Sequence, residues 1–104
     1  MTVGPPPPDG VTQRLQPASD LLRALAAPIR LGIVRELAEG PKPVHALVAA
    51  LEASQPLVSQ HLRILRGAGV VEAHRRAREI EYSLVDDHVA HIVLDAIRHA
   101  DEVA

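Results

Sequence analysis

The chain has 104 residues, of which 47% are hydrophobic and 23% are charged, so we expect one folded domain and exclude an intrinsically disordered protein. It contains no cysteine, which excludes disulfide scaffolds, thiol chemistry and zinc or iron–sulfur sites built on cysteine. Its formal net charge is −2, and its single aromatic residue, Tyr82, argues against a protein that stacks single-stranded bases on aromatic rings.

The sequence also bears on where the protein works. It has no run close to the roughly 18 consecutive apolar residues of a membrane span. Its opening segment, MTVGPPPPDG, has neither the basic nor the apolar region of a signal peptide. We therefore expect a cytoplasmic protein that has no membrane partner.

Residues 1–16 are predicted to form a disordered, proline-rich arm, because Pro5–Pro8 stand in a row and proline lacks the N–H that helices and sheets require. The folded domain is expected over residues 17–104. Its first helix should run from about Pro17 to Ala26, and Pro28 should start a second helix that ends near Glu39.

A helix-turn-helix is predicted in the middle of the chain. A short helix, about Val44–Glu52, is followed after about three residues by a longer one that opens at Ser54 or Gln55 and ends near Ala68. The side of the longer helix that should face the core carries Leu57, Val58, Leu62 and Leu65. The opposite side should expose the polar side chains of Gln55, Ser59, Gln60 and Arg63.

A β-hairpin with a basic tip is predicted next. Two short alternating segments, Val70–His74 and Glu79–Leu84, flank the three arginines Arg75, Arg76 and Arg78. A last amphipathic helix is expected from about Asp87 to Glu102. The predicted class is therefore a mainly α domain with a small β-hairpin, a winged helix-turn-helix with the element order α-α-α-α-β-β-α.

Charge is unevenly distributed along the chain. Residues 54–78 contain five arginines and one glutamate, a balance of +4, whereas residues 79–104 contain seven acidic residues and one arginine, a balance of −6. Such segregation is typical of one surface for a polyanion and another for a cation, although solvated helix faces give similar counts.

The helix and the hairpin together are suited to reading double-stranded DNA. Glutamine can pair with adenine and arginine with guanine in the major groove, while arginines on a hairpin can hold phosphates and reach a minor groove. The alternative is that SQPLVSQHLRILRGAG is an amphipathic helix with a solvated face. The short helix before it and the hairpin after it favour the DNA reader.

Residues 21–84 carry two segments, LLRALAAPIRLGIVRELAEG and ASQPLVSQHLRILRGAGVVEAHRRAREIEYSL, that resemble the ArsR/SmtB family of winged-helix repressors. The resemblance implies a homodimer that binds double-stranded operator DNA, with its recognition helix at about Gln55–Ala68. The residues expected to contact DNA are Ser54, Gln55, Ser59, Gln60, His61, Arg63, Arg75, Arg76 and Arg78.

Four potential metal ligands lie on or near the last helix: Asp86, His88, His99 and Glu102. His88 and His99 are eleven residues apart, which places them within about 20° of one helix face but about 16 Å apart along it. Zinc binds its ligands at about 2 Å, so both histidines can serve one ion only if a second copy of the helix lies antiparallel across a twofold axis. Asp86 and His88 would then join His99 and Glu102 of the partner subunit, which gives two identical sites per dimer.

Two imidazoles and two carboxylates form a tetrahedral ligand set that suits Zn(II) and is tolerable for Co(II), whereas Ni(II) usually takes more ligands. The four residues also resemble, position by position, the interfacial zinc site on the C-terminal helix of SmtB-type sensors. The alternatives are that this is an acidic, histidine-bearing solvent face, and that His91 is an extra ligand or a solvated histidine. The segment PKPVHALV lacks the cysteines that some relatives carry, which argues against thiolate sensing of arsenic, cadmium or lead.

The combined expectation is a metal-responsive transcriptional repressor, not an enzyme. The apo homodimer would bind operator DNA, and Zn(II), or else Co(II) or Ni(II), would be the allosteric effector that lowers DNA affinity and derepresses metal-homeostasis genes. The alternatives are a nickel- or cobalt-responsive repressor and one that does not respond to metals. A small hydrolase is disfavoured because the chain has no cysteine, four serines and no triad-like or glycine-rich phosphate motif.

Overall fold

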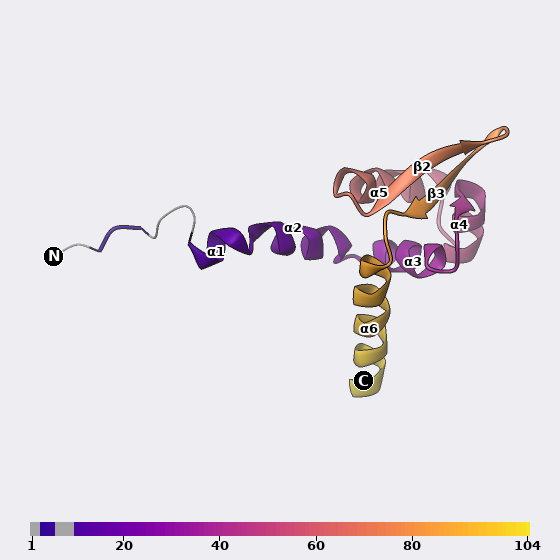
Figure 1. Ribbon diagram of the computed structural model, residues 1–104. Helices are drawn as coiled ribbons and strands as arrows, with labels where there is room; N and C mark the ends of the chain where they lie inside the picture. Colours follow the sequence, from indigo (N-terminus) through magenta and orange to yellow (C-terminus); the bar gives the residue numbers. More distant parts are fainter. Residues whose placement is uncertain (1–2, 6–9) are drawn as a thin grey trace.

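The computed structural model describes residues 3–5 and 10–104, and Figure 1 shows how their helices and strands are arranged. In chain order the elements are α1 (Val11–Arg14), α2 (Gln16–Leu25), α3 (Pro28–Leu37), β1 (Lys42–Pro43), α4 (Val44–Leu51), α5 (Gln55–Gly67), β2 (Val71–Arg76), β3 (Glu79–Leu84) and α6 (His88–Val103). A central body holds α3, α4, α5 and the sheet, while α2 and α6 extend from it in different directions (Figure 1). The predicted class, a mainly helical winged domain, is confirmed. None of the helices in the described part of the chain is long and apolar enough to span a membrane.

Three helices start where the sequence supplies proline, and one of these three also has a capping side chain. Proline stands in the first turn of α2, α3 and α5, where an N–H would have no partner within the helix. The Ser54 hydroxyl accepts a hydrogen bond from the backbone N–H of Leu57 at 3.3 Å and so caps α5. At the end of α4, Glu52 adopts a left-handed conformation with a φ of 52°, which turns the chain toward α5.

An aliphatic core lies between the end of α2, the helices α3, α4 and α5, the base of the hairpin and the first turns of α6. It consists of Leu25, Ile33, Val34, Leu37, Leu47, Val58, Leu62, Leu65, Val70, Val71, Val89 and Val93. Gly32 of α3 is buried, and a β-carbon added there would lie 2.7 Å from Cδ2 of Leu51 on α4. The missing side chain therefore lets α3 and α4 approach closely, which holds the helix-turn-helix against the core.

The wing is the hairpin of β2 and β3, in register from Val71 opposite Leu84 to Arg76 opposite Glu79. β1 adds a two-residue strand at the other edge of β3, so the strand order is β1-β3-β2 and the sheet is antiparallel. This strand was not predicted from the sequence, because two residues carry no alternating pattern and only their pairing with β3 makes them a strand.

Lys42 of β1 ties the sheet to the end of α3. Its Nζ lies 2.9 Å from a carboxylate oxygen of Glu36 and 2.7 Å from one of Glu39. The hydrogen bond from Lys42, and then its charge, hold the pKa of Glu39 below its usual value. The same hydrogen bonds to Glu39 and Glu36 raise the pKa of Lys42.

The structure differs from the prediction at the end of the N-terminal arm. Helical hydrogen bonds start earlier than predicted: the Arg14 N–H donates to the Gly10 carbonyl at 3.0 Å, and the Ser19 N–H donates to the Leu15 carbonyl at 3.0 Å. The arm predicted over residues 1–16 is therefore too long, since α1 begins at Val11. Most of the proline run lies outside the described residues, so the disorder predicted there stays a prediction.

Candidate nucleic-acid interface and subunit face

Helix α5 has a buried side and a polar side. Val58, Leu62 and Leu65 are buried, as predicted. Leu57, which was predicted to face the core with them, is 41% exposed, because the buried residues recur at i, i+4 and i+7 and Leu57 lies about 100° away from Val58. On the polar side Ser54, Gln55, Gln60 and Arg63 are exposed and Ser59 is half-buried. His61, which was predicted to contact DNA with them, is half-buried and lies about 60° from Val58, at the edge of the buried side.

The wing presents its predicted basic tip to solvent. Arg75, Arg76 and Arg78 are all exposed. Arg76 Nη1 lies 3.7 Å from a carboxylate oxygen of Glu81, and within the described residues Arg75 and Arg78 form no ion pair. Arg75 and Arg78 are therefore available to a polyanion, in agreement with the basic balance of this part of the sequence.

A groove connects the start of α5 to the wing. Gln55 lines it from α5, Arg78 and Glu79 line it from the hairpin, and His45 lines it from α4. His45 Nε2 lies 2.9 Å from Oε1 of Glu79 and so links α4 to β3. His45 was not among the residues predicted from the sequence, because its partner is 34 residues away and only the fold brings them together.

His61 makes a contact that crosses from α5 to α3. Its Nδ1 lies 3.2 Å from Nη1 of Arg30, and the contact is partly buried. Arg30 Nε is also buried, and it has no hydrogen-bond partner among the residues that the structure describes. Arg30 was not predicted to belong to the site, since it stands in the preceding helical segment with no motif that marks it.

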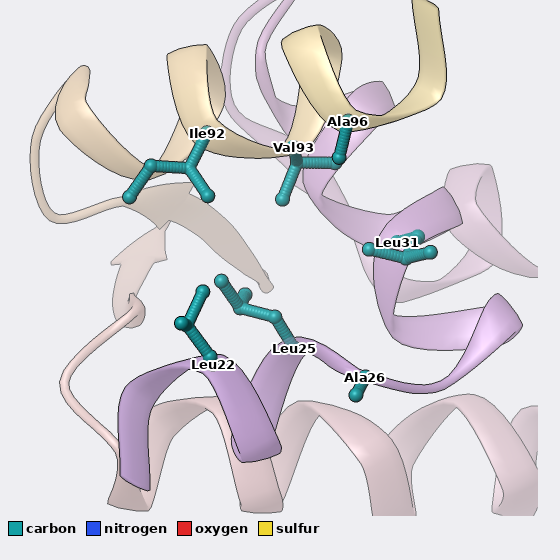
Figure 2. Close-up of a pocket in the computed structure, with 7 residues that line it drawn as sticks. All are labelled: Leu22, Leu25, Ala26, Leu31, Ile92, Val93 and Ala96. Carbon is teal, nitrogen blue, oxygen red and sulfur yellow. The ribbon is translucent and has the colours of Figure 1, made fainter. Parts of the chain in front are cut away.

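Helices α2 and α6 leave an apolar surface open. Figure 2 shows Leu22 and Leu25 of α2 pointing toward Ile92 and Val93 of α6. These four side chains help to line a hollow of about 170 Å³. Leu22 is 53% exposed and Ile92 is 39% exposed. Leu25 and Val93 are buried beneath them. Exposed apolar side chains that are grouped in this way are typical of a surface that another molecule covers.

The predicted metal ligands occupy the two ends of α6. Asp86 precedes the helix, and its carboxylate accepts a hydrogen bond from the His88 backbone N–H at 2.9 Å and lies 3.5 Å from His88 Nδ1. His99 and Glu102 are exposed in the last turns. Within the described part of this single chain, no three histidine or acidic side chains gather as a metal site. The structure therefore brings Asp86 and His88 together, and the four-ligand site between two chains stays a prediction.

A helix-turn-helix with a polar second helix, followed by a basic wing, defines a winged-helix DNA-binding domain. A sequence model described as "Bacterial regulatory protein, arsR family" matches residues 27–73. The chain is 57% identical over 99 residues to the HTH-type transcriptional repressor SmtB of Mycobacterium tuberculosis H37Rv, an alignment that covers 95% of this chain and 71% of that protein. It is 41% identical over 92 residues to the HTH-type transcriptional regulator NmtR of the same organism, covering 88% and 77%.

A solved structure agrees with these sequence relatives. Mb0332 from Mycobacterium bovis, described as a homodimeric winged helix-turn-helix DNA-binding domain, matches with a TM-score of 0.78 and 28% identity over 97% of this chain and 92% of that one. The chain belongs to the ArsR/SmtB family of winged-helix transcriptional regulators. The predicted family is confirmed, as is the prediction that the protein regulates transcription and is not an enzyme.

Proposed function

We propose that this protein is a transcriptional repressor whose homodimer binds operator DNA and releases it when Zn(II) binds between the subunits. One observation carries the proposal: the polar side of α5 and the arginine tip of the wing are both exposed, in a chain that is 57% identical to a transcriptional repressor. Regulation by Zn(II) is supported by the ligand chemistry of α6.

Helix α5 is the proposed recognition helix. Its residues that would meet base edges and phosphates in the major groove are Gln55, Ser59, Gln60, His61 and Arg63. Ser54 already uses its oxygen to cap the helix, so it would offer its hydroxyl proton to a phosphate. The residues of the wing that would contact phosphates or an adjacent minor groove are Arg75, Arg76 and Arg78.

The proposed occupant of the α2–α6 surface is a second copy of this chain. The surface is apolar and open, and Leu22 and Ile92 are substantially exposed on it. The related Mb0332 domain is homodimeric. A twofold dimer presents two recognition helices, so it would read two half-sites related by the same symmetry.

The donors on α6 fit a zinc ion chemically. Two imidazoles and two carboxylates make a complete tetrahedral set, and all four side chains are exposed. Asp86 uses one oxygen to accept from the His88 N–H, which leaves its other oxygen for an ion. A bound ion would hold the ends of two α6 helices together. By thermodynamic linkage, the factor by which the ion lowers the affinity for DNA equals the factor by which DNA lowers the affinity for the ion.

The test is binding of the full chain to a fluorescent duplex that the protein has selected from a random pool, measured by anisotropy at fixed salt. We expect Zn(II) to weaken binding by about tenfold or more, and EDTA to restore it. A response to Ni(II) or Co(II) alone would favour a different inducer. Tight binding that no metal changes would leave the repressor in place and contradict the metal site.

Variants of α6 test the assigned ligands. His99→Gln should keep the DNA affinity of the apo protein and lose the response to Zn(II). His91→Gln is the matched control, because His91 is an exposed histidine of the same helix outside the proposed set. If Zn(II) still released the His99→Gln protein from DNA, the ligand assignment would be wrong.

A further inference from the structure

We propose that Ile80 of the wing is a DNA-contacting residue, which packs on the deoxyribose carbons of one operator strand where that strand passes between α5 and the wing. The inference rests on the proposed binding of operator DNA. It adds an apolar contact to a proposed set that contains only polar and charged side chains.

Ile80 lies on the side of the hairpin that packs against the body of the domain. Side chains alternate along a strand, so Ile80, Tyr82 and Leu84 of β3 share one side of the sheet. Tyr82 and Leu84 pack against the core. The tip of the hairpin projects beyond the helices (Figure 1), and Ile80, close to that tip in sequence, is 46% exposed. Its side chain therefore continues the body-facing side of the wing into solvent.

The groove between α5 and the wing brings Ile80 to residues that are expected to bind DNA. Gln55, at the start of α5, and Arg78, at the tip of the wing, line this groove together with Ile80. Arg75 stands directly opposite Ile80 in the register of the hairpin, so their side chains lie on the same side of the sheet. Both arginines are exposed. An exposed apolar side chain is thus flanked by two exposed cations.

The acidic residue of the groove does not reverse this charge. Glu79 lines the groove, and its Oε1 lies 2.9 Å from Nε2 of His45 on α4. Two arginines, Arg75 and Arg78, against this one glutamate leave a formal balance of +1 at and beside the groove. The groove therefore suits an anionic ligand that also has apolar surface.

The backbone of a DNA strand has this combination of chemistry. If α5 lies in the major groove and the wing lies at the adjacent minor groove, the protein straddles the backbone that separates the two grooves. That backbone alternates anionic phosphates with deoxyribose rings, whose edges are mostly C–H groups. Arg75 and Arg78 suit the phosphates, and Ile80 suits a sugar between them. Contact with the sugar would remove apolar surface of Ile80 from water, which favours binding.

The first test measures binding of the full chain, by anisotropy, to the duplex that the wild type selects from a random pool. Ile80→Ala should bind about tenfold more weakly, while the slope of log affinity against log salt stays the same because no charge is lost. Ile80→Leu keeps the apolar volume and should recover most of the affinity. An unchanged affinity of Ile80→Ala would overturn the proposal.

Val85→Ala is the matched control for this test. Val85 is 48% exposed, and it follows β3 at the base of the hairpin, away from the tip. Its truncation should therefore leave the DNA affinity unchanged, and a loss equal to that of Ile80→Ala would overturn the proposal. Melting curves check that each variant is folded, which we expect because both side chains are substantially exposed.

A charge placed at position 80 tests whether this side chain lies beside the backbone. Ile80→Lys should steepen the salt slope by about one, because a lysine next to a phosphate releases one more counterion on binding. Val85→Lys should leave the slope unchanged. An unchanged slope in Ile80→Lys would overturn the proposal.

Site-directed cleavage locates the contact on the DNA. The chain contains no cysteine, so Ile80→Cys introduces its only thiol. An iron chelate attached to this thiol generates hydroxyl radicals, which cut the nearest deoxyribose rings. We expect one cluster of cuts in each half-site from Ile80→Cys and none from the same label on Val85→Cys. The same pattern from both labels, or no cuts from Ile80→Cys, would overturn the proposal.

These outcomes separate the inference from the proposed function. If the wild type selects a duplex and Ile80→Ala binds it equally tightly, the inference fails and the repressor function stands. A wild type that selects no duplex would contradict the repressor function itself, and the inference with it.

Discussion

Glu52 contributes to the helix-turn-helix through its backbone. Its φ of 52° and ψ of 42° are left-handed, a conformation that costs a residue with a side chain free energy and that glycine adopts freely. Glu52→Gly should therefore raise the free energy of unfolding by up to about 1 kcal/mol, measured by urea denaturation. Ala50→Gly, an exposed position inside α4, is the control and should lower it by about 1 kcal/mol. A loss of stability in both variants would contradict this account of the turn.

The contact between Lys42 and Glu39 makes the free energy of unfolding change with pH in the acid range. It holds the pKa of Glu39 below its usual value, so the stabilisation is present above the unfolded-state pKa and is lost as pH falls through the lower folded-state pKa. Lys42→Met should therefore flatten the decline of unfolding free energy between about pH 5 and pH 3, measured by urea denaturation at stepped pH. Arg98→Met removes a longer, exposed pair with Asp95, at 3.6 Å, and should leave the decline unchanged. An equally steep decline in Lys42→Met would argue against this role.

At the scale of elements, α5 and the wing should divide the work of DNA binding. Arg78→Ala should weaken binding to all duplexes alike and reduce the salt slope by about one, because a phosphate contact is lost. Gln60→Ala should leave the slope unchanged and relax the preference for one base pair, because a base contact is lost. Anisotropy titrations at several salt concentrations, on selected and scrambled duplexes, measure both effects. A changed base preference in Arg78→Ala with an unchanged slope would reverse these assignments.

The helices were predictable where local chemistry sets their ends. Pro28, Pro56 and the Ser54 cap mark starts that the sequence displays, and the polar side of α5 follows from helical periodicity. The earlier start at Val11 was not predictable, because the proline run nearby suggested an extended chain. β1 was missed because a two-residue strand exists only through its partner.

The candidate site was predictable to the extent that its residues share one element. The arginines of the wing are exposed where the pattern placed them. The pairs Arg30–His61 and His45–Glu79 join residues 31 and 34 apart, and they depend on packing that no local pattern encodes. The spacing of His88 and His99 predicts that one chain alone cannot bring both histidines to one metal ion. How a second chain would complete the site could not be predicted from that spacing.

At the scale of the whole molecule, the α2–α6 surface should decide whether the protein is a dimer. Ile92→Glu places a charge on this apolar surface, so we expect it to sediment as a monomer in analytical ultracentrifugation. Ile80→Glu, at a similarly exposed isoleucine on the wing, should remain a dimer and serves as the control. A dimeric Ile92→Glu or a monomeric Ile80→Glu would place the subunit interface elsewhere.

The open surface between α2 and α6 also links folding to abundance. Leu22 and Ile92 are exposed on the single chain. In the proposed dimer a second copy covers them, so association would stabilise the folded chain by mass action. The melting temperature should then rise with protein concentration. In a cell that makes few copies, many chains would be single and less stable, so the expression level of the gene would itself limit how many operators are occupied.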